Sequence, residues 1–325
     1  MCAVEYRKAG LRLTGTPLWL DATRKAELSF VSHAHSDHIA RHERVIATAA
    51  TLRFMQHRLR KVKNALPVPY NRPFELGPLV LELLPAGHVL GSAQLRATLA
   101  DGTRVVYTGD INTVPSLTAE PAQIAECDVL IIESTFGHPR YAFPSRERVF
   151  DKIANWCQDH LRQGVTPIVL GYALGKSQEA IAALSRRGLR MCAHASIHDV
   201  ATLYGELGMP LEVRRFEGRF EEGEVGIFPP HIARSAALRK IERRAVAVLT
   251  GWAIDGPQIA RRYGADVAFP VSDHADFRAL VAYARATGAS EVITHHGFAD
   301  ELAEGLRAES ILARAVHKPL QLSLL

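Results

Sequence analysis

The sequence has few cysteines and no long apolar run, and both absences narrow its class. Its four cysteines are scattered without a CxxC pair, so neither a disulfide framework nor a thiolate zinc site is indicated. No stretch of about 18 apolar residues occurs. The first 20 residues carry Glu5, Arg7, Lys8 and Arg12 and lack a secretory pattern. We therefore expect a cytoplasmic protein with reduced cysteines and no membrane segment.

Low-complexity segments are also missing, and the remaining composition is that of a folded protein. The 325 residues are 47% hydrophobic, which is enough for a large core but long for one average domain, so we expect two domains. The net charge of +5 and the pI near 9.1 favour a polyanionic partner only weakly, because many basic proteins bind none. Basic runs at 58–63 and 239–244 are interpreted either as an approach path for such a partner or as solvated helix faces.

Short apolar runs alternate with helical patterns along the chain. The first 140 residues are rich in strands, whereas from Arg146 onward helices and buried strands alternate. Such alternation implies a parallel sheet with crossover helices. The expected strands are 28–32, 45–48, 79–84, 95–99, 104–108, 129–133, 166–170 and 291–294, and the expected helices are 49–62, 146–163, 176–186 and one from Ala299.

One stretch concentrates side chains that can bind metal. Residues 33–38 are His-Ala-His-Ser-Asp-His, directly after the apolar segment 28–31. Without a cation, four such groups crowded behind a strand would repel and desolvate one another. Strand ends converge at one face of a sheet, and zinc and manganese accept imidazole and carboxylate ligands, so the sequence predicts a metal centre there. Polar residues at other strand ends that could join it are Asp21, His88, Asp110, Glu133, His274 and His296.

The first part of this pattern resembles the signature of the metallo-β-lactamase fold, with Asp21 before the string and His88 and Asp110 after it. The resemblance implies two divalent metal ions, zinc or manganese, with Asp110 bridging them and Asp21 orienting a ligating imidazole. The ligands it assigns are His33, His35 and His88 to one ion, and Asp37, His38 and His296 to the other. His295 competes with His296 for the last place, and the glycine that follows favours His296 because the family pattern is His-Gly.

The second part resembles the β-CASP nucleases of that fold, most of all the bacterial ligase-associated DNA exonucleases. Glu133 in ESTFG, His274 in SDHAD and His296 in HHG are similar to three further motifs of this group. Residues 169–184 resemble its phosphate-proximal segment. Together the two resemblances cover roughly residues 21–298 of the chain.

The fold class that the resemblance implies is α/β, a metallo-β-lactamase αββα sandwich with an inserted β-CASP α/β cap. The sandwich would comprise residues 1–142 and 269–325, and the cap residues 143–268, with Pro144 and Pro270 at the two joins. A groove between cap and sandwich would suit a single strand better than a duplex, because the scissile phosphate must reach a recessed metal centre.

The implied chemistry is hydrolysis of a phosphodiester by water that the two metals activate. Asp37, His274 and Glu133 are assigned as catalytic, with Asp37 as a metal ligand, His274 as the general acid and Glu133 as its carboxylate partner. Lys176 and Ser177, where a helix begins, are expected to bind a substrate phosphate. A solvated lysine at the start of a helix is the alternative for Lys176.

The function that the resemblance implies is a 5′-to-3′ exonuclease of single-stranded DNA that releases 5′-phosphorylated nucleotides. The resemblance adds a role in DNA repair and functional association with a DNA ligase and a helicase. A ribonuclease of the β-CASP RNA-processing type is the alternative, because the motifs do not separate the two sugars. The cap segment and the two trailing histidines disfavour a small-molecule hydrolase, and the complete ligand set disfavours a noncatalytic nucleic-acid binder.

Overall fold

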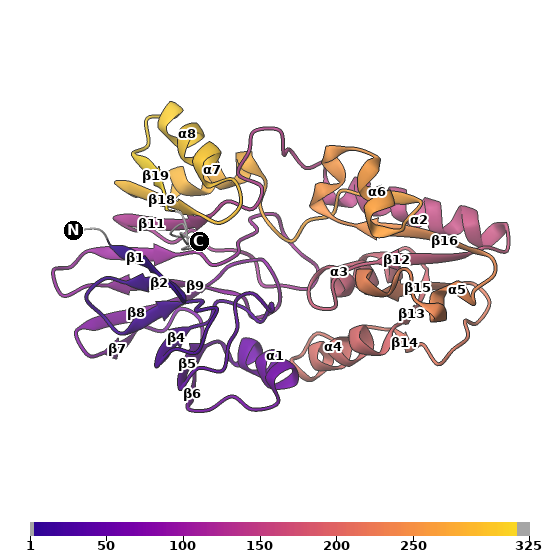
Figure 1. The fold of residues 1–325 in the computed structure, drawn as a ribbon, viewed down its shortest axis with the longest axis horizontal. Coiled ribbons are helices and arrows are strands. Elements are labelled where there is room, and N and C mark those ends of the chain that lie inside the picture. The colour runs from indigo at the N-terminus through magenta and orange to yellow at the C-terminus, as the bar shows by residue number, and fades with distance from the viewer. Residues whose placement is uncertain (1–2, 317–325) are drawn as a thin grey trace, which may run out of the picture. The chain divides into compact units, whose positions relative to one another are not determined.

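The chain, in a computed structural model that describes residues 3–316, forms two compact units (Figure 1). One consists of Met1–Ala142 and His274–Leu325, and the other, Phe143–Asp273, is inserted into it. The sequence analysis places the second join at 268/269, before the structural boundary at 273/274. The reason is strand β17 (Val267–Phe269), which pairs with the sheet of the inserted unit and keeps the chain there. That this unit serves as a β-CASP cap stays a prediction.

The first unit contains two sheets with a shared apolar core. The strand orders are β1-β2-β3-β4-β5-β6 and β19-β18-β11-β10-β9-β8-β7. Phe30 from one sheet and Leu83 from the other are fully buried in one cluster, so the core lies between the sheets. The strands are β1 (Val4–Arg7), β2 (Gly10–Leu13), β3 (Leu18–Leu20), β4 (Leu28–Phe30), β5 (Arg44–Ala47), β6 (Ala65–Pro67), β7 (Phe74–Leu76), β8 (Leu79–Pro85), β9 (Ala93–Thr98), β10 (Arg104–Tyr107), β11 (Val129–Glu133), β18 (Glu291–His295) and β19 (Ala313–Ala315).

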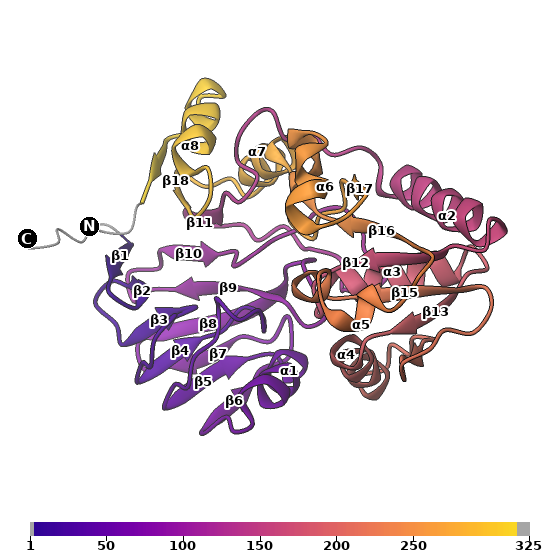
Figure 2. The same cartoon turned by 45° about the vertical axis from the view of Figure 1, so that its right-hand side comes forward.

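Helices cover the second of these sheets on the side away from that core. Helices α7 (Phe277–Ala286) and α8 (Ala299–Ala308) pack apolar side chains against β11 and β18 in a second cluster (Figure 2). Helix α1 (Ala49–Leu59) follows β5 directly. It begins at Thr48, whose hydroxyl accepts the N–H of Thr51, the usual way to satisfy a free donor at a helix start.

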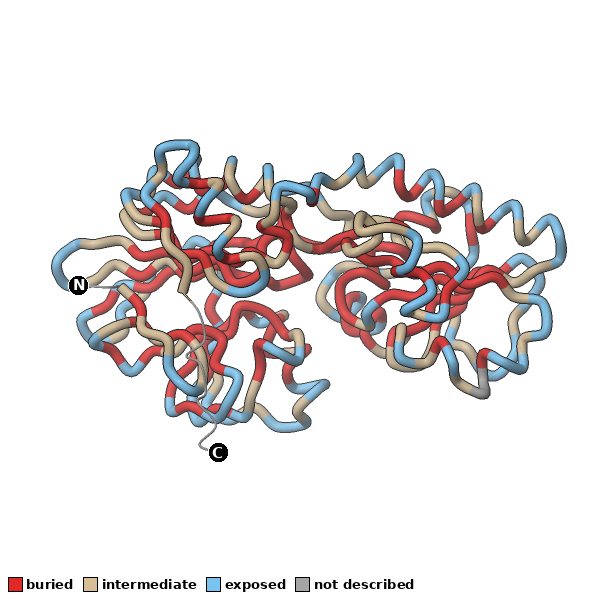
Figure 3. The backbone as a smooth tube through the Cα atoms, turned by 45° about the horizontal axis from the view of Figure 1, so that its top comes forward, coloured by how far each residue is buried: buried red, intermediate tan, exposed pale blue. Residues whose placement is uncertain are grey.

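The inserted unit is built on one sheet whose paired strands are all parallel, in the order β14-β13-β15-β12-β16-β17. Burial on both faces explains why its central strands are continuous apolar runs. Figure 3 shows buried segments running through the interior of each unit and exposed segments at its periphery. The elements are α2 (Arg146–Arg162), β12 (Thr166–Leu170), α3 (Lys176–Ser185), β13 (Arg190–Ala193), α4 (Ala195–Glu206), β14 (Arg214–Arg215), β15 (Glu224–Phe228), η1 (Pro230–Ile232), α5 (Ala236–Arg239), β16 (Arg244–Leu249), η2 (Gly251–Asp255), α6 (Gln258–Tyr263) and β17.

Two predictions that concern cysteines and membranes can be compared with the described residues. Cys127, Cys157 and Cys192 are buried and free, as expected of reduced packing residues, and Cys2 lies outside the described range. Within residues 3–316, none of the helices combines the length and the apolar character that crossing a bilayer requires.

Candidate metal centre

Three loops of the first unit bring four ligand-type side chains together. His33 and His35 follow β4, His88 lies between β8 and β9, and Asp110 follows β10. His35 Nδ1 lies 3.0 Å from His33 Nε2 and 3.1 Å from His88 Nε2. Asp110 Oδ2 lies 3.4 Å from His33 Nε2 and 3.7 Å from His88 Nε2. The loops at the strand ends therefore bring three imidazoles and one carboxylate together at one point.

These spacings are those of ligands around one cation. A tetrahedral ion with bonds of about 2.0–2.2 Å holds its ligand atoms about 3.3–3.6 Å apart. The four donor atoms lie within 4.8 Å of one another. Three imidazole nitrogens and a carboxylate oxygen are a donor set that zinc and manganese accept. The side chains thus fit a divalent metal ion.

The charge state of His33 also suits a ligand. Burial lowers the pKa of His33 well below its ordinary value, and the neighbouring imidazoles of His38, His88 and His35 lower it further. The ring therefore stays neutral, which is the form that binds metal. Burial likewise raises the pKa of Asp110, against the lowering effect of His38. A cation at this point would relieve the cost of burying that carboxylate.

A second group of ligand-type atoms lies on the other side of Asp110. His38 Nε2 is 3.4 Å from Asp110 Oδ2 and 3.8 Å from Asp37 Oδ2. Burial lowers the pKa of His38, but the carboxylates of Asp110, Asp21 and Asp37 outweigh it and raise this pKa to about 10. The carboxylates that favour a proton on this ring would equally favour a cation bound at Nε2, and binding of that cation would displace the proton.

Asp21 positions the His38 ring through a hydrogen bond at Nδ1, the ring nitrogen that does not face Asp110. Its Oδ2 lies 2.8 Å from His38 Nδ1 and accepts hydrogen bonds from Tyr107 Oη at 2.9 Å and Ser32 Oγ at 2.5 Å. Its Oδ1 accepts the Ser32 N–H at 2.6 Å. With His38 Nδ1 donating to Asp21, Nε2 is directed at Asp110. This is the geometry expected of a carboxylate that orients a ligating imidazole.

Asp37 and His296 are the exposed members of the predicted ligand set. Burial raises the pKa of Asp37, but His38, His35 and His296 add lowering charges and the net shift is downward. His296 also contributes a lowering charge at Asp110. Its charge therefore acts at the second group, although its role as a ligand stays a prediction.

The His-Gly pair at the end of β18 has a steric cause. His296 has φ +63° and Gly297 has φ +59°. A Cβ on Gly297 would lie 2.4 Å from the carbonyl oxygen of Ser134, so the chain can pass there only with glycine. His295 is packed differently, since its ring stacks on Tyr107 with centroids 5.5 Å apart and burial lowers its pKa to about 4.

Glu133 and His274 form a pair beside Asp110. His274 Nδ1 lies 2.9 Å and 3.1 Å from the two Glu133 oxygens and 3.9 Å from Asp110 Oδ2. Glu133 also accepts the N–H groups of Ile111 at 2.8 Å and Thr135 at 3.2 Å. Burial raises the pKa of Glu133, but the charge and hydrogen bond of His274 and these N–H donors outweigh it and lower the pKa to about 2. Glu133 is therefore a fixed anion that orients His274.

Lys176 and Ser177 belong to the inserted unit, at the start of α3. Lys176 is buried and its Nζ lies 3.1 Å from Asp273 Oδ2, so the alternative of a solvated lysine is wrong. The Ser177 hydroxyl is buried without a hydrogen-bond partner among the described residues. Phosphate binding by these two residues stays a prediction.

Three polar residues that support the predicted ones could not be identified from the sequence. Ser32 and Tyr107 hold Asp21, and Asp273 pairs with Lys176. Ser32 and Asp273 stand next to motif histidines, so their positions carry a weak signal. Tyr107 lies within a buried strand and nothing in the sequence relates it to Asp21.

Comparisons with known proteins agree with this geometry. Residues 6–166 match the beta-lactamase superfamily domain. The chain is 37% identical over 317 residues to a probable DNA ligase of Opitutus terrae, covering 97% of this chain and 31% of that protein. It is 32% identical over 188 residues to the 5′ exonuclease Apollo of Gallus gallus, covering 52% of this chain and 39% of that protein. The chain thus spans less than half the length of these relatives.

A solved structure extends the comparison beyond recognisable sequence similarity. A protein of unknown function from Enterococcus faecalis V583 superposes with a TM-score of 0.56 at 11% sequence identity. The match covers 89% of this chain and 79% of that one. At this identity the likeness concerns the fold alone.

Proposed function

The chain carries a metallo-β-lactamase superfamily domain, and on that premise we propose that it is a metal-dependent nuclease of the β-CASP type. The α/β fold class predicted from the sequence is confirmed. The observation that carries the proposal is the donor set of His33, His35, His88 and Asp110 with the Glu133–His274 pair beside it. The relative named as a 5′ exonuclease supports nucleic acid as the substrate class.

The two groups of ligand-type residues have different roles in the proposed hydrolysis of a phosphodiester. When bound, divalent cations supply Lewis acidity, which activates water and neutralises charge that develops on the phosphate. In this proposal His33, His35 and His88 would hold one cation, Asp37, His38 and His296 would hold the second, and Asp110 would serve both. Asp21 fixes the tautomer of His38.

His274 is the proposed general acid. Glu133 accepts a hydrogen bond from His274 Nδ1, which leaves His274 Nε2 to donate a proton to the departing sugar oxygen. Because the pKa of Glu133 is lowered to about 2, the carboxylate remains an anion throughout the working pH range and stabilises the imidazolium. The buried wall around Glu133 keeps this pair in one orientation.

The proposed substrate is single-stranded DNA, degraded from the 5′ end to 5′-phosphorylated nucleotides in DNA repair. The relative named as a probable DNA ligase matches nearly the whole of this chain, which supports functional association with DNA ligation. The proposed association with a helicase rests on the family resemblance alone. A ribonuclease of the RNA-processing type is the second candidate, because the motifs do not separate the two sugars and one relative is named an RNase J-like protein.

Digestion of end-labelled strands tests the proposal. DNA and RNA, single and double stranded and labelled at either end, are incubated with manganese or zinc, and products are resolved by length and end group. We expect mononucleotides with 5′-phosphates from single-stranded DNA. Asp110→Asn should abolish digestion, whereas Asp101→Asn, at an exposed turn, should not. Faster digestion of RNA would favour the second candidate, and no digestion of any strand would refute both.

A further inference from the structure

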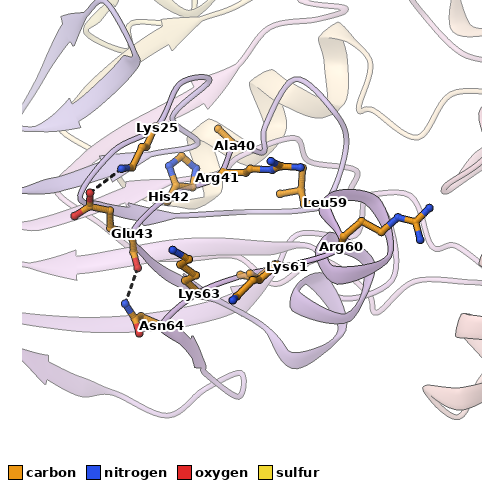
Figure 4. A pocket seen from close by; sticks show the side chains of 11 residues that line it. Lys25, Ala40, Arg41, His42, Glu43, Leu59, Arg60, Lys61, Lys63 and Asn64 are labelled. Carbon is orange, nitrogen blue, oxygen red and sulfur yellow. Dashed lines mark hydrogen bonds and ion pairs between the residues drawn. The ribbon is translucent and has the colours of Figure 1, made fainter.

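A pocket of about 580 Å³ opens in the first unit (Figure 4). It is formed by the loop that continues from the histidine turn, Ala40 to Glu43, and by the end of α1 with the segment that follows it. None of the proposed metal ligands lines it. We call it the basic pocket, because its lining includes Lys25, Arg41, Arg60, Lys61 and Lys63.

Positive charge in the basic pocket is largely uncompensated. Glu43 is the carboxylate in its lining, and its oxygen lies 2.9 Å from Lys25 Nζ. The Lys25 hydrogen bond and charge lower the pKa of Glu43, and the charges of Arg44 and Lys63 lower it further, so Glu43 stays ionised and offsets Lys25 first and Lys63 in part. Among residues 3–316, no carboxylate forms an ion pair with the four other cations, which are Arg41, Arg60, Lys61 and Lys63. Four like charges around one cavity repel, and a bound anion would remove that cost.

An unused hydrogen-bond donor lies in the same wall. His42 is buried, and its Nδ1 accepts the N–H of Ala26 at 3.2 Å. Burial lowers the pKa of His42, so the ring is neutral and its proton is on Nε2. This Nε2 is buried with no partner among the described residues. A buried donor without an acceptor is unfavourable, and an anion oxygen in the pocket would satisfy it after a shift of the ring, because Nε2 is closed to solvent in this arrangement.

The walls of the basic pocket are held by hydrogen bonds to backbone carbonyls. The Glu43 N–H donates to the Ala26 carbonyl at 3.0 Å. Asn64 Nδ2 donates to the Glu43 carbonyl at 3.1 Å, and the Val45 N–H donates to the Asn64 carbonyl at 3.2 Å. The cavity therefore exists before a ligand arrives, which reduces the entropy that binding must overcome.

We propose that the basic pocket binds backbone phosphates of a nucleic-acid strand at a distance from its scissile bond. The lining has no Phe, Tyr or Trp on which a base could stack, so the contacts would be to phosphates and independent of sequence. The inference rests on the proposed function for the identity of the polyanion. It makes strands that reach from the metal centre to the pocket better substrates than short ones.

A binding measurement in EDTA tests the pocket apart from catalysis. A fluorescent single-stranded DNA oligonucleotide is titrated with the full chain, followed by anisotropy over a range of salt. The double variant Lys61→Gln/Lys63→Gln should weaken binding about tenfold and lower the slope of log K against log salt by about 1.4. The control Lys8→Gln/Arg72→Gln removes the same charge from exposed residues outside the pocket and should change Kd less than about twofold.

Two further measurements distinguish a failure of the pocket inference from a failure of the proposed function. Hydrolysis of bis(p-nitrophenyl) phosphate with manganese tests the metal centre alone, and both double variants should match the wild type. No hydrolysis by the wild type would refute the proposed function and leave the pocket result standing. Equal loss of DNA binding in the two double variants, or no loss in either, would overturn the pocket inference. Displacement of DNA by polyglutamate at equal charge concentration would overturn nucleic acid as its ligand.

Discussion

Replacing Glu133 with glutamine should remove the orientation of His274 while keeping the shape of the side chain. Each carboxylate oxygen of Glu133 accepts from His274 Nδ1, one also from the Ile111 N–H and the other from the Thr135 N–H. A glutamine amide places an NH₂ group against one of these donors. One donor is then left without an acceptor, and the imidazolium loses its counter-charge.

The size of the effect follows from these contacts. Leaving a buried donor unsatisfied costs about 1–3 kcal/mol. Since His274 would rotate or adopt the other tautomer, we expect most of the contribution of general acid catalysis to be lost, about 10²–10⁴-fold in kcat. KM should change little, because Glu133 is buried and does not contact substrate in this proposal.

Steady-state digestion of labelled DNA over a range of pH measures the expected loss in kcat and the small change in KM. In the wild type the alkaline limb of the kcat profile should report loss of the proton from His274, and Glu133→Gln should flatten it. The matched control is Glu82→Gln, which removes a buried carboxylate paired with Arg96 in the same sheet. A Glu133→Gln enzyme with unchanged kcat and pH profile, or one no slower than Glu82→Gln, would refute the role of the pair.

Three further predictions concern the support of the metal groups and the inserted unit. Gly109→Ala should be less stable than Gly77→Ala by about 1–3 kcal/mol and should therefore unfold at a lower temperature. Gly109 and Gly77 have nearly the same φ, +56° and +58°, but only at Gly109 would the new Cβ meet another side chain, Ser32, at 2.4 Å. Equal melting temperatures would contradict this. Ser32→Ala, which removes a hydrogen bond to the carboxylate behind the metal groups, should weaken metal binding about 10–100-fold in a chelator competition, and an unchanged Kd would count against it. Glu224→Gln should lower Tm by about 2–4 °C at neutral pH. Because the Arg214 hydrogen bond lowers the pKa of Glu224, that contribution is present above the ordinary value of 4.5 and should fade as the pH falls below it, and a Tm difference independent of pH would contradict the pairing.

The strongly patterned elements could be predicted from the sequence, and the weakly patterned ones could not. Strands β11 and β12 were expected at their observed bounds because each is a short apolar run between turn residues. Helix α1 ends at Leu59, three residues before the expected 62, where Arg60 adopts φ +69°. Strand β1 is Val-Glu-Tyr-Arg and strand β14 is Arg-Arg, and neither carries an apolar pattern that a sequence analysis can use.

The clustering of His33, His35, His88 and Asp110 could be predicted from residue types, whereas the side chains that support them carry little or no signal in the sequence. Several histidines and aspartates at strand ends indicate a metal centre, because few other structural roles require these residue types together at such positions. Tyr107 and the orphaned Nε2 of His42 depend on which loops meet in space, and that is set by packing of the two sheets. The join at Asp273 depends on the pairing of β17, which is too short to be recognised alone.

Anomalous scattering from crystals of the full chain grown with manganese or zinc tests the central claim most directly. We expect two peaks per chain, one bound by His33, His35 and His88, one by Asp37, His38 and His296, with Asp110 between them. A chain that scatters at neither position, with these side chains ordered, would contradict a two-metal nuclease.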